Sequence, residues 1–414
     1  MRLHPALCAC PVASDQPLIL RVSPDAERRL RLGHPWLYDQ AIRKQNRRGH
    51  SGDLAAIYDR RERFLAIGLY DPDSAIRVRV LQARRSARIN EDWFGDRLRA
   101  AIELRHPLAT PRTTGYRLVH GENDRLPGLV LDRYDSTLVM KLYTAAWIPH
   151  LRMVVEALVA VWPLKRLVLR LSRALQHRPE RLHGLEDGML LIGPAIQQPV
   201  IFLEQGLRFE VDPIHGQKTG FFLDQRDNRA KLEPLSAGRS ILDGFAYTGA
   251  FSVYAARGGA REVTSVDASR PALLVAQRNM ALNRNYPGVA AVSHHLIPGD
   301  VFEVLERLQK RRVRFDLVNL DPPAFAKMKQ EIPAALLAYA RLTRVGVGLL
   351  RPEGLLVISS CSSQISAEQF FTTVRRAAKS AGRPLRELER TGHPLDHPIR
   401  FPEGAYLKGL FVLA

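Results

Sequence analysis

The segment DPPAF, from Asp321 to Phe325, contains two side chains that could hold a planar substrate. Pro322 and Pro323 favour an extended, rigid backbone, because the proline ring fixes φ, lacks an N–H donor and disfavours helix at the residue before it. Asp321 would bind the substrate by a hydrogen bond and Phe325 would stack on it. The alternative is that the prolines only stiffen the entry to a helix.

Cys361 ends the apolar run GLLVISSC and is a candidate nucleophile. A cysteine thiolate can form a covalent bond to an electrophilic carbon. A single cysteine is also compatible with a small buried thiol, which is the more common role. The residues alone leave both interpretations of Cys361 open.

A third set of residues predicts a site for a nucleoside cofactor. A strand ends at Asp243, the loop GFAYTG follows, and a helix begins after Gly249. Ligands of open α/β sheets bind at the carboxyl ends of the strands, where Asp267 could accept from ribose hydroxyls and Asp300 from an adenine amine. The full G-x-G-x-x-G pattern is missing, which makes a dinucleotide less favoured. Alternatively, the glycines serve a turn and the two later acids cap helices.

Strand and helix patterns alternate through residues 212–414 and predict a doubly wound, parallel α/β sheet. Residues 17–90 contain short β-type runs broken by Gly, Asp and Pro, which predict a small barrel with basic edges. Residues 91–211 combine a helical connector with strands and one amphipathic helix, which predicts a small α+β layer. We therefore expect three domains with these boundaries.

The charge of the chain indicates a polyanionic partner. The 414 residues contain 61 Lys and Arg against 42 Asp and Glu, a formal net charge of +19. Nucleic acid is the first candidate for such a partner and a membrane surface the second, and the alternative is a compositional bias toward arginine. The three cysteines, the lack of an apolar stretch of about 18 residues and the lack of a signal-peptide pattern favour a cytoplasmic protein without a membrane partner.

Further motifs carry a family resemblance. They are GQKTGFFLDQRDNR (216–229), RLVHGE (117–122), LPGLV (126–130) and DRY (132–134). With the four loops above they resemble a class I S-adenosylmethionine-dependent methyltransferase and, more narrowly, the bacterial 23S rRNA (cytosine-C5) methyltransferase I family. The resemblance runs from about Leu18 onward. It implies an N-terminal PUA RNA-binding β-barrel, a central small α+β (EEHEE) domain and a C-terminal Rossmann-like methyltransferase domain.

The resemblance also implies roles for residues of this chain, with S-adenosylmethionine as cofactor and no metal. Asp321 and Cys361 would be catalytic, and Lys218 would line the cleft. Arg226 could meet the cofactor carboxylate, by charge complementarity. One departure is Ser363, where the family pattern commonly has glycine. The remaining cofactor-site residues are Asp243, Phe245, Tyr247, Thr248, Gly249, Asp267 and Asp300, and the remaining substrate-site residues are Pro322, Pro323, Phe325, Arg77 and Arg79.

The implied reaction is methylation of cytosine C5. The Cys361 thiolate would add to C6, Asp321 would protonate N3, and the target base would leave its stack. Arg77 and Arg79 would contact phosphates of the RNA, which would be 23S rRNA or a pre-50S particle. Homodimer formation is left open. The rival functions are methylation of a purine ring or exocyclic nitrogen with a structural Cys361, and a non-catalytic role in RNA binding or ribosome assembly.

Overall fold

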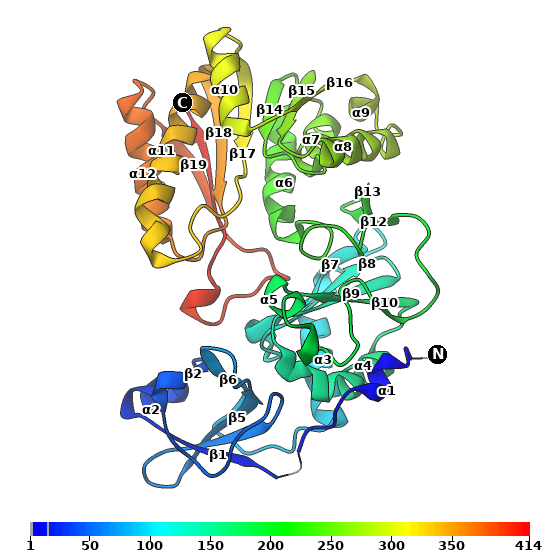
Figure 1. Cartoon of the computed structure of the whole chain (residues 1–414). Helices are drawn as coiled ribbons and strands as arrows, with labels where there is room; N and C mark the ends of the chain where they lie inside the picture. The colour runs from blue at the N-terminus through cyan, green and yellow to red at the C-terminus, as the bar shows by residue number, and fades with distance from the viewer. Residues whose placement is uncertain (1–2, 15) are drawn as a thin grey trace. The chain divides into compact units, whose positions relative to one another are not determined.

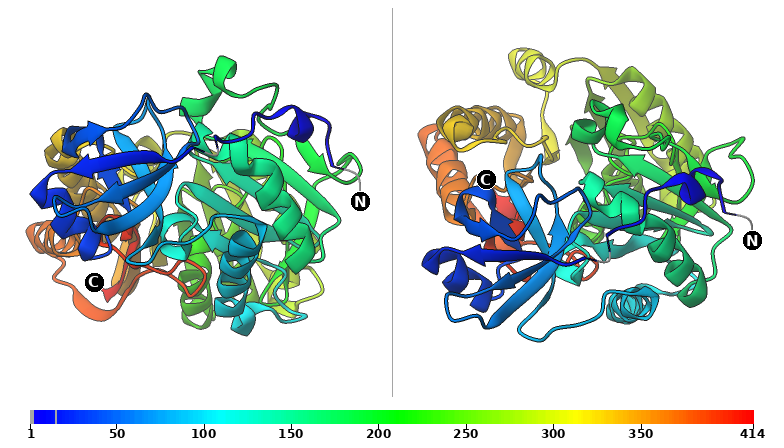
Figure 2. Two further views of the ribbon diagram at one scale, coloured as in Figure 1. Left: turned by 90° about the horizontal axis from the view of Figure 1, so that it is seen from below. Right: turned by 60° about the horizontal axis from the view of Figure 1, so that its bottom comes forward.

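The computed structural model describes residues 3–14 and 16–414. The chain divides into two compact units (Figures 1 and 2). Unit 1 contains the chain up to Phe202, together with Val211–Phe221 and Leu395–Pro402. Unit 2 contains Leu203–Glu210, Phe222–Pro394 and Glu403–Ala414. Each unit therefore includes segments that are distant from the rest of it in the sequence.

The first sheet of unit 1 has six strands in the order β2-β6-β5-β4-β1-β3. Its helix α2 begins after Ser23, whose Oγ accepts a hydrogen bond from the backbone N–H of Ala26. Leu18, Leu20 and Val22 alternate along β1 and lie in the core, as the period-2 pattern requires. The elements are β1 (Leu18–Val22), α2 (Pro24–Arg31), β2 (Trp36–Tyr38), β3 (Ile42–Gln45), β4 (Leu54–Tyr58), β5 (Phe64–Tyr70) and β6 (Ile76–Ala83), preceded by α1 (Ala6–Ala9).

The second sheet of unit 1 has five strands in the order β11-β10-β9-β8-β7. Strands β8, β9, helix α4, β10 and β11 follow one another in the expected EEHEE order, and β7 precedes them and pairs with β8. Leu151, Val154, Val155 and Leu158 form the buried face of α4, as their spacing predicts. The elements are α3 (Glu91–Leu104), β7 (Gly115–His120), β8 (Leu129–Tyr134), β9 (Thr137–Leu142), α4 (Leu151–Val161), β10 (Arg166–Leu171), α5 (Arg173–Gln176) and β11 (Leu190–Ile192).

The segment Leu395–Pro402 is bound into unit 1 by buried polar contacts. Asp396 is fully buried; its Oδ2 accepts from the backbone N–H of Arg117 at 2.9 Å, and its carbonyl accepts from Arg105 Nη2 at 2.9 Å. Arg105 also forms a buried ion pair with Asp124 at 2.7 Å. The segment is therefore an integral part of unit 1.

Unit 2 is built on a seven-stranded sheet in the order β16-β15-β14-β17-β18-β20-β19. Strands β14 to β18 are parallel, as strand–helix alternation predicts, whereas β20 and β19 are antiparallel. A fully parallel sheet was therefore a wrong expectation at this edge. The strands are β14 (Ser240–Gly244), β15 (Glu262–Asp267), β16 (Ser293–Pro298), β17 (Phe315–Leu320), β18 (Leu350–Ser360), β19 (Arg386–Thr391) and β20 (Lys408–Leu413), and the separate hairpin β12 (Val200–Glu204) and β13 (Leu207–Val211) precedes them.

Helices cover both faces of this sheet, which explains why its central strands are almost entirely buried. Figure 1 shows α7 and α8 together on one side, and α11 and α12 together on the other. Phe251 of α7 and Phe370 of α12 lie in separate buried clusters against the strands. The helices are α6 (Arg226–Leu232), α7 (Ala250–Arg257), α8 (Arg270–Leu282), α9 (Pro287–Ala291), α10 (Val301–Lys310), α11 (Ile332–Gly348) and α12 (Ala367–Ser380).

Candidate active site

The loop after β14 has a strained, tightly packed backbone. Phe245 and Tyr247 adopt positive φ angles of 63° and 48°, which are uncommon for side chains larger than glycine. Gly249 has φ 73°, and a Cβ atom there would lie 2.5 Å from the Cβ of Ala276, so glycine is required. The ring of Tyr247 meets that of Phe222 edge-on at 5.1 Å. Strain of this kind typically marks a loop that binds a ligand.

Asp267 fastens this loop and still has room to bind a ligand. Its Oδ2 accepts from the backbone N–H of Tyr247 and its Oδ1 from that of Ser269, both at 2.8 Å. The side chain is half-buried, and a carboxylate offers about four acceptor positions. Asp300 is exposed and caps α10 by accepting from the N–H of Glu303 at 3.1 Å. Both acids thus make the local backbone contacts that the cap interpretation predicts, and either could also accept from a ligand.

Asp243 lies deeper than the other two acids. It is 1% exposed, its Oδ2 accepts from Ser252 Oγ at 2.6 Å, and its Oδ1 accepts from Asn319 Nδ2 at 2.9 Å. Burial is the main cause that raises the pKa of Asp243 to about 6. The carboxyl group therefore joins β14 to α7 and β17 beneath the loop. Thr248 is also buried, and its carbonyl accepts from Asn279 at 2.9 Å.

The chain of hydrogen bonds continues from Asp243 to the edge strand β16. Ser252 Oγ lies 2.7 Å from Ser265 Oγ, which lies 2.8 Å from His294 Nε2. Burial, and to a smaller extent the charge of His295, lowers the pKa of His294 to about 4. The row of polar side chains across β14, α7, β15 and β16 is therefore continuous within the sheet.

The structure brings Asp321 and Cys361 to neighbouring strand ends. Asp321 directly follows β17 and Cys361 directly follows β18, which pairs with β17 in parallel. Cys361 Sγ lies 3.8 Å from the carbonyl oxygen of Pro322. Both side chains are half-buried, and Cys361 is not in a disulfide. A thiol and a carboxyl group thus lie at adjacent strand ends, and covalent catalysis would need both groups near one substrate.

Two side chains of unit 2 hold Asp321 through a chain of hydrogen bonds. Gln225 Nε2 donates to Asp321 Oδ1 at 2.7 Å, and Asn228 Nδ2 donates to Gln225 Oε1 at 2.6 Å. Arg226, at the start of α6, is buried and lies 3.6 Å from the Oδ1 atom of Asp227. Gln225 and Asn228 belong to the long motif GQKTGFFLDQRDNR, from which no role was predicted for them. Their hydrogen bonds now identify them as positioning residues for Asp321.

The Phe325 ring lies among aromatic side chains of its own unit. Its centroid is 4.8 Å from that of Tyr339 and 6.0 Å from that of Phe302. Tyr339 donates to Ser360 Oγ at 2.9 Å, and burial raises its pKa. Pro322 is buried and Pro323 exposed. Stacking of Phe325 on a substrate stays a prediction.

Sequence reasoning missed Lys408, the first residue of β20. The side chain is 6% exposed, and its Nζ donates to the carbonyl oxygens of Ser362 and, at 2.9 Å, of Tyr406. Because β20 is antiparallel to β18, its first residue lies opposite Ser360, at the end of β18 where Cys361 follows. The only signal in the sequence is a lysine before the apolar run GLFVL.

Three predicted substrate residues belong to unit 1. The carbonyl of Lys218 accepts from Lys141 Nζ at 3.1 Å, and Lys218 itself has φ 54°. Arg79 is 8% exposed and donates to the carbonyl of Ile76 at 3.2 Å. A phosphate contact would therefore require the Arg79 side chain to move outward.

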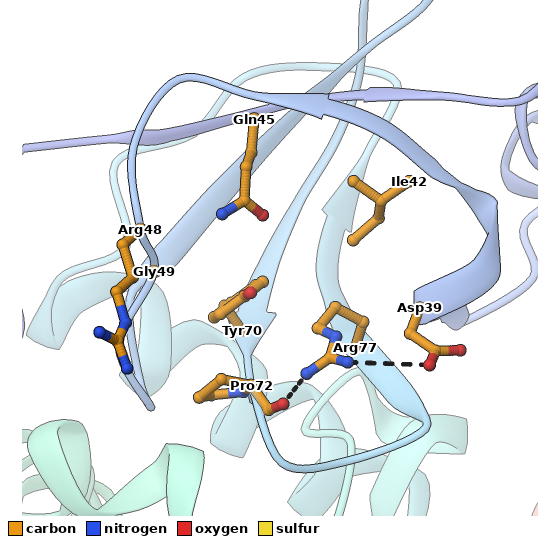
Figure 3. A pocket seen from close by; sticks show the side chains of 8 residues that line it. All are labelled: Asp39, Ile42, Gln45, Arg48, Gly49, Tyr70, Pro72 and Arg77. Atoms are coloured by element: carbon orange, nitrogen blue, oxygen red, sulfur yellow. Dashed lines mark hydrogen bonds and ion pairs between the residues drawn. The ribbon is translucent and has the colours of Figure 1, made fainter.

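Arg77 lines a pocket of about 370 Å³ in the six-stranded part of unit 1 (Figure 3). Its guanidinium donates to the carbonyls of Asp71 and Pro72 and lies 3.8 Å from Asp39. Arg48 is exposed and lines the same pocket. The remaining lining residues are Ile42, Gln45, Gly49 and Tyr70.

Two models of known protein families match this chain. A model of the S-adenosylmethionine-dependent methyltransferase family matches residues 164–412, and a model of the PUA-like domain matches residues 20–83. The first match covers more than half of the chain. This protein belongs to the S-adenosylmethionine-dependent methyltransferases.

Two relatives narrow the family of this methyltransferase. A ribosomal RNA large subunit methyltransferase of Deinococcus radiodurans is 48% identical over 409 residues, which cover 98% of this chain and 99% of the relative. Ribosomal RNA large subunit methyltransferase I of Pseudoalteromonas translucida is 38% identical over 387 residues, or 93% and 96% of the two chains. The methyltransferase is therefore a member of the ribosomal RNA large subunit methyltransferase I family, as the motifs predicted.

Solved structures confirm the predicted fold class of the methyltransferase. A Streptococcus mutans protein assigned to the SAM-dependent methyltransferases has a TM-score of 0.80 at 22% identity and covers 96% of this chain and 100% of its own. A methyltransferase structure complexed with SAH has a TM-score of 0.81, with the same identity and coverage. Together with the PUA-like match, they establish a PUA-like domain and a Rossmann-like methyltransferase fold. The three domain boundaries stay predictions.

The cofactor of this methyltransferase is S-adenosylmethionine. The residues present fit it, because the strained loop and the half-buried Asp267 lie where parallel strands end, and Asp267 retains acceptor capacity. Among residues 3–14 and 16–414, no group of three or more His, Cys, Asp or Glu could hold a metal ion. In that same part of the chain, no helix is long and apolar enough to cross a membrane.

Proposed function

We propose that this methyltransferase forms 5-methylcytosine in the RNA of the large ribosomal subunit through a covalent bond from Cys361 to cytosine C6. The observation that carries the proposal is the placement of the Cys361 thiol 3.8 Å from the Asp-Pro-Pro backbone that begins with Asp321. The relatives named above as ribosomal RNA large subunit methyltransferases support the choice of RNA.

The proposed reaction uses the two side chains in sequence. The Cys361 thiolate forms a bond to C6 while Asp321 donates a proton to N3, which breaks the aromaticity of the ring and makes C5 nucleophilic. S-adenosylmethionine supplies the electrophilic methyl group that C5 attacks. Loss of the C5 proton to a solvent water and cleavage of the S–C6 bond then restore the aromatic ring and the thiolate. N3 returns the borrowed proton to Asp321.

The PUA-like domain would supply RNA contacts outside the reacting base. The guanidinium groups of Arg48 and Arg77 and the amide of Gln45 all line the pocket of Figure 3. Guanidinium groups suit phosphates, and an amide suits a base edge. The formal charge of +19 favours the same partner. We expect Arg48→Ala to weaken RNA binding several-fold and to reduce its salt dependence by about one ion, measured by filter binding.

The main test is tritium transfer from labelled S-adenosylmethionine to ribosomal RNA, naked and in subunits, followed by nucleoside analysis. We expect 5-methylcytosine in 23S rRNA from the wild-type chain. Cys361→Ala should lose on the order of a thousandfold or more in rate, while its cofactor affinity by calorimetry stays unchanged. Cys10→Ala is the matched control and should retain activity.

Two other outcomes would contradict the proposal. Label in a purine nucleoside would assign the enzyme to nitrogen methylation, with Cys361 as a structural thiol. Full activity of Cys361→Ala would exclude the covalent step. A cytoplasmic location is a further prediction, which cell fractionation tests. The sequence left the substrate form of the RNA and homodimer formation open, and the naked-RNA and subunit arms and light scattering decide them.

A further inference from the structure

Lys408 contacts the chain on both sides of Cys361, at the end of β18. Lys408 lies opposite Ser360 in the β18–β20 ladder, so its backbone is in register with the residue before Cys361. Its Nζ donates to the carbonyl oxygen of Ser362, the residue after Cys361. The third contact, to the carbonyl of Tyr406 at 2.9 Å, fixes the side chain from the segment that precedes β20. The ammonium group is therefore held at the level of Cys361.

The burial of Lys408 calls for a negative partner. The side chain is only 6% exposed, and both of its hydrogen-bond acceptors are neutral carbonyls. Among residues 3–14 and 16–414, no carboxylate forms an ion pair with Lys408. A buried charge without a counter-ion is costly, which is why such groups are usually paired.

Cys361 is the group whose charge acts on Lys408. Burial lowers the pKa of Lys408 and the Cys361 thiolate raises it, and the net result is a pKa of about 8. The interaction is reciprocal, because an ammonium that gains from a thiolate also favours that thiolate over the thiol.

We propose that Lys408 is the counter-ion that holds Cys361 as a thiolate, ready to attack cytosine C6. This role rests on the proposed covalent function and makes Lys408 a positioning residue, since it does not touch the substrate. The thiol proton leaves to solvent, and the electron pair of the thiolate forms the S–C6 bond. Elimination returns that pair to sulfur, beside the ammonium group. Lys408 keeps its proton throughout.

The other titratable groups around Lys408 and Cys361 leave this role to the lysine. Asp321 accepts from Gln225, and Tyr339 is kept neutral because burial raises its pKa. His393 Nε2 accepts from the backbone N–H groups of Tyr406 and Leu407, so that nitrogen carries no proton. Tyr406 donates its hydroxyl to Asp224 Oδ2 at 2.9 Å. The two carboxylates would disfavour a thiolate nearby, so a cation is needed to stabilise it.

The test follows the alkylation of Cys361 by iodoacetamide against pH, in the full-length chain, with peptide-resolved mass spectrometry to separate it from Cys8 and Cys10. In the wild type we expect half-maximal reactivity below pH 8.5, the value of an ordinary thiol. Lys408→Met should move this midpoint up by at least one pH unit, a tenfold slower reaction at pH 7. Lys408→Arg should retain the wild-type midpoint. Lys310→Met, on the exposed end of α10, is the control.

Each outcome decides the proposal. A wild-type midpoint at or above pH 8.5 overturns it without any variant, so a misfolded Lys408→Met cannot hide a failure. An unchanged midpoint in a folded Lys408→Met, judged by cofactor binding and circular dichroism, also overturns it. In support, methylation by Lys408→Met should recover as pH rises, whereas a purely structural defect would lower the rate at every pH.

The same experiment separates this inference from the proposed function. If the midpoint shifts as expected and Cys361→Ala still methylates RNA, the lysine–thiolate pair exists and the covalent mechanism is wrong. If the midpoint does not respond to Lys408 and Cys361→Ala is inactive, the covalent mechanism stands and another group activates the thiol.

Discussion

The two halves of the seven-stranded sheet hold buried charge in different ways. In the half made of β14, β15 and β16, the carboxyl group of Asp243 is surrounded by the neutral donors Ser252 and Asn319. In the half made of β17, β18 and β20, the ammonium of Lys408 has only carbonyl acceptors and lies at the level of a half-buried thiol. The buried acid is satisfied by neutral side chains, one of them Asn319 of the adjoining strand β17, whereas the buried ammonium lies near a group that can react.

This difference predicts which substitutions affect rate and which affect stability. A buried acid with complete hydrogen bonding fixes the elements around it, so its loss should weaken folding. A side chain next to the reacting base should instead affect the chemical step. The following substitutions test this division, in order of decreasing effect.

Asp321→Asn should have the largest effect. Asparagine keeps the shape and the contact with Gln225 but cannot donate a proton to cytosine N3. We expect the methylation rate to fall about 100- to 10,000-fold with little change in unfolding free energy, measured by single-turnover assay and urea denaturation. Asp316→Asn, at the opposite end of β17, is the matched control. A large loss of stability in Asp321→Asn would remove the distinction between the two halves.

Asp243→Asn should change how stability depends on pH. The pKa of Asp243 is raised from 3.8 to about 6, so between these values the folded protein keeps a proton that the unfolded chain loses. Wild-type stability therefore falls as pH rises through this range, by about 3 kcal/mol from this group. The variant lacks this contribution. Between pH 4 and pH 7, the unfolding free energy measured by urea denaturation should fall less, or rise more, in the variant than in the wild type.

His294→Gln should show the opposite sign at the other end of the same hydrogen-bonded row. The pKa of His294 is lowered from 6.5 to about 4, so the unfolded chain takes up a proton in this range before the folded protein does. Stability from His294 is therefore present above pH 6.5 and is lost as pH falls to 4, by about 2 kcal/mol after allowance for partial exposure. If Asp243→Asn and His294→Gln changed the pH dependence of the unfolding free energy in the same direction, the burial assigned to one of the two side chains would be wrong.

Gly249→Ala should have a smaller effect, on both folding and cofactor binding. The added Cβ would lie 2.5 Å from that of Ala276, at a φ of 73°. We expect a loss of about 2 kcal/mol in unfolding free energy and weaker cofactor binding by calorimetry. Gly382→Ala, at φ 73° with no neighbour within 4 Å, controls for backbone strain alone. Equal losses in both variants would mean that the contact with Ala276 is unimportant.

Sequence patterns predicted the parallel strands of unit 2 because strand patterns alternate with helix patterns along this part of the chain. They did not reveal β19 or β20. Strand β19 is the polar, largely exposed run Arg386–Thr391, which has no apolar periodicity. Its place depends on pairing with β20, a tertiary contact that local sequence does not encode.

The candidate site shows the same division. The proximity of Asp321 and Cys361 follows from parallel topology, since adjacent strands end at one edge of the sheet. Lys408 reaches that edge only because an antiparallel strand brings its first residue there. The bonds of Gln225 and Asn228 to this site likewise depend on how α6 packs in unit 2, which no spacing in the sequence reveals.

The assignment of Leu395–Pro402 to unit 1, between two strands of unit 2, has a consequence for the history of this gene. A single recombination event near residue 212 could not exchange the methyltransferase part alone. The exchanged part would also bring its own copy of this segment, which would have to fit Arg105 and the N–H of Arg117. The two units are therefore expected to be inherited together and to vary in concert, so that a change in one of these contacts is matched by a change in its partner.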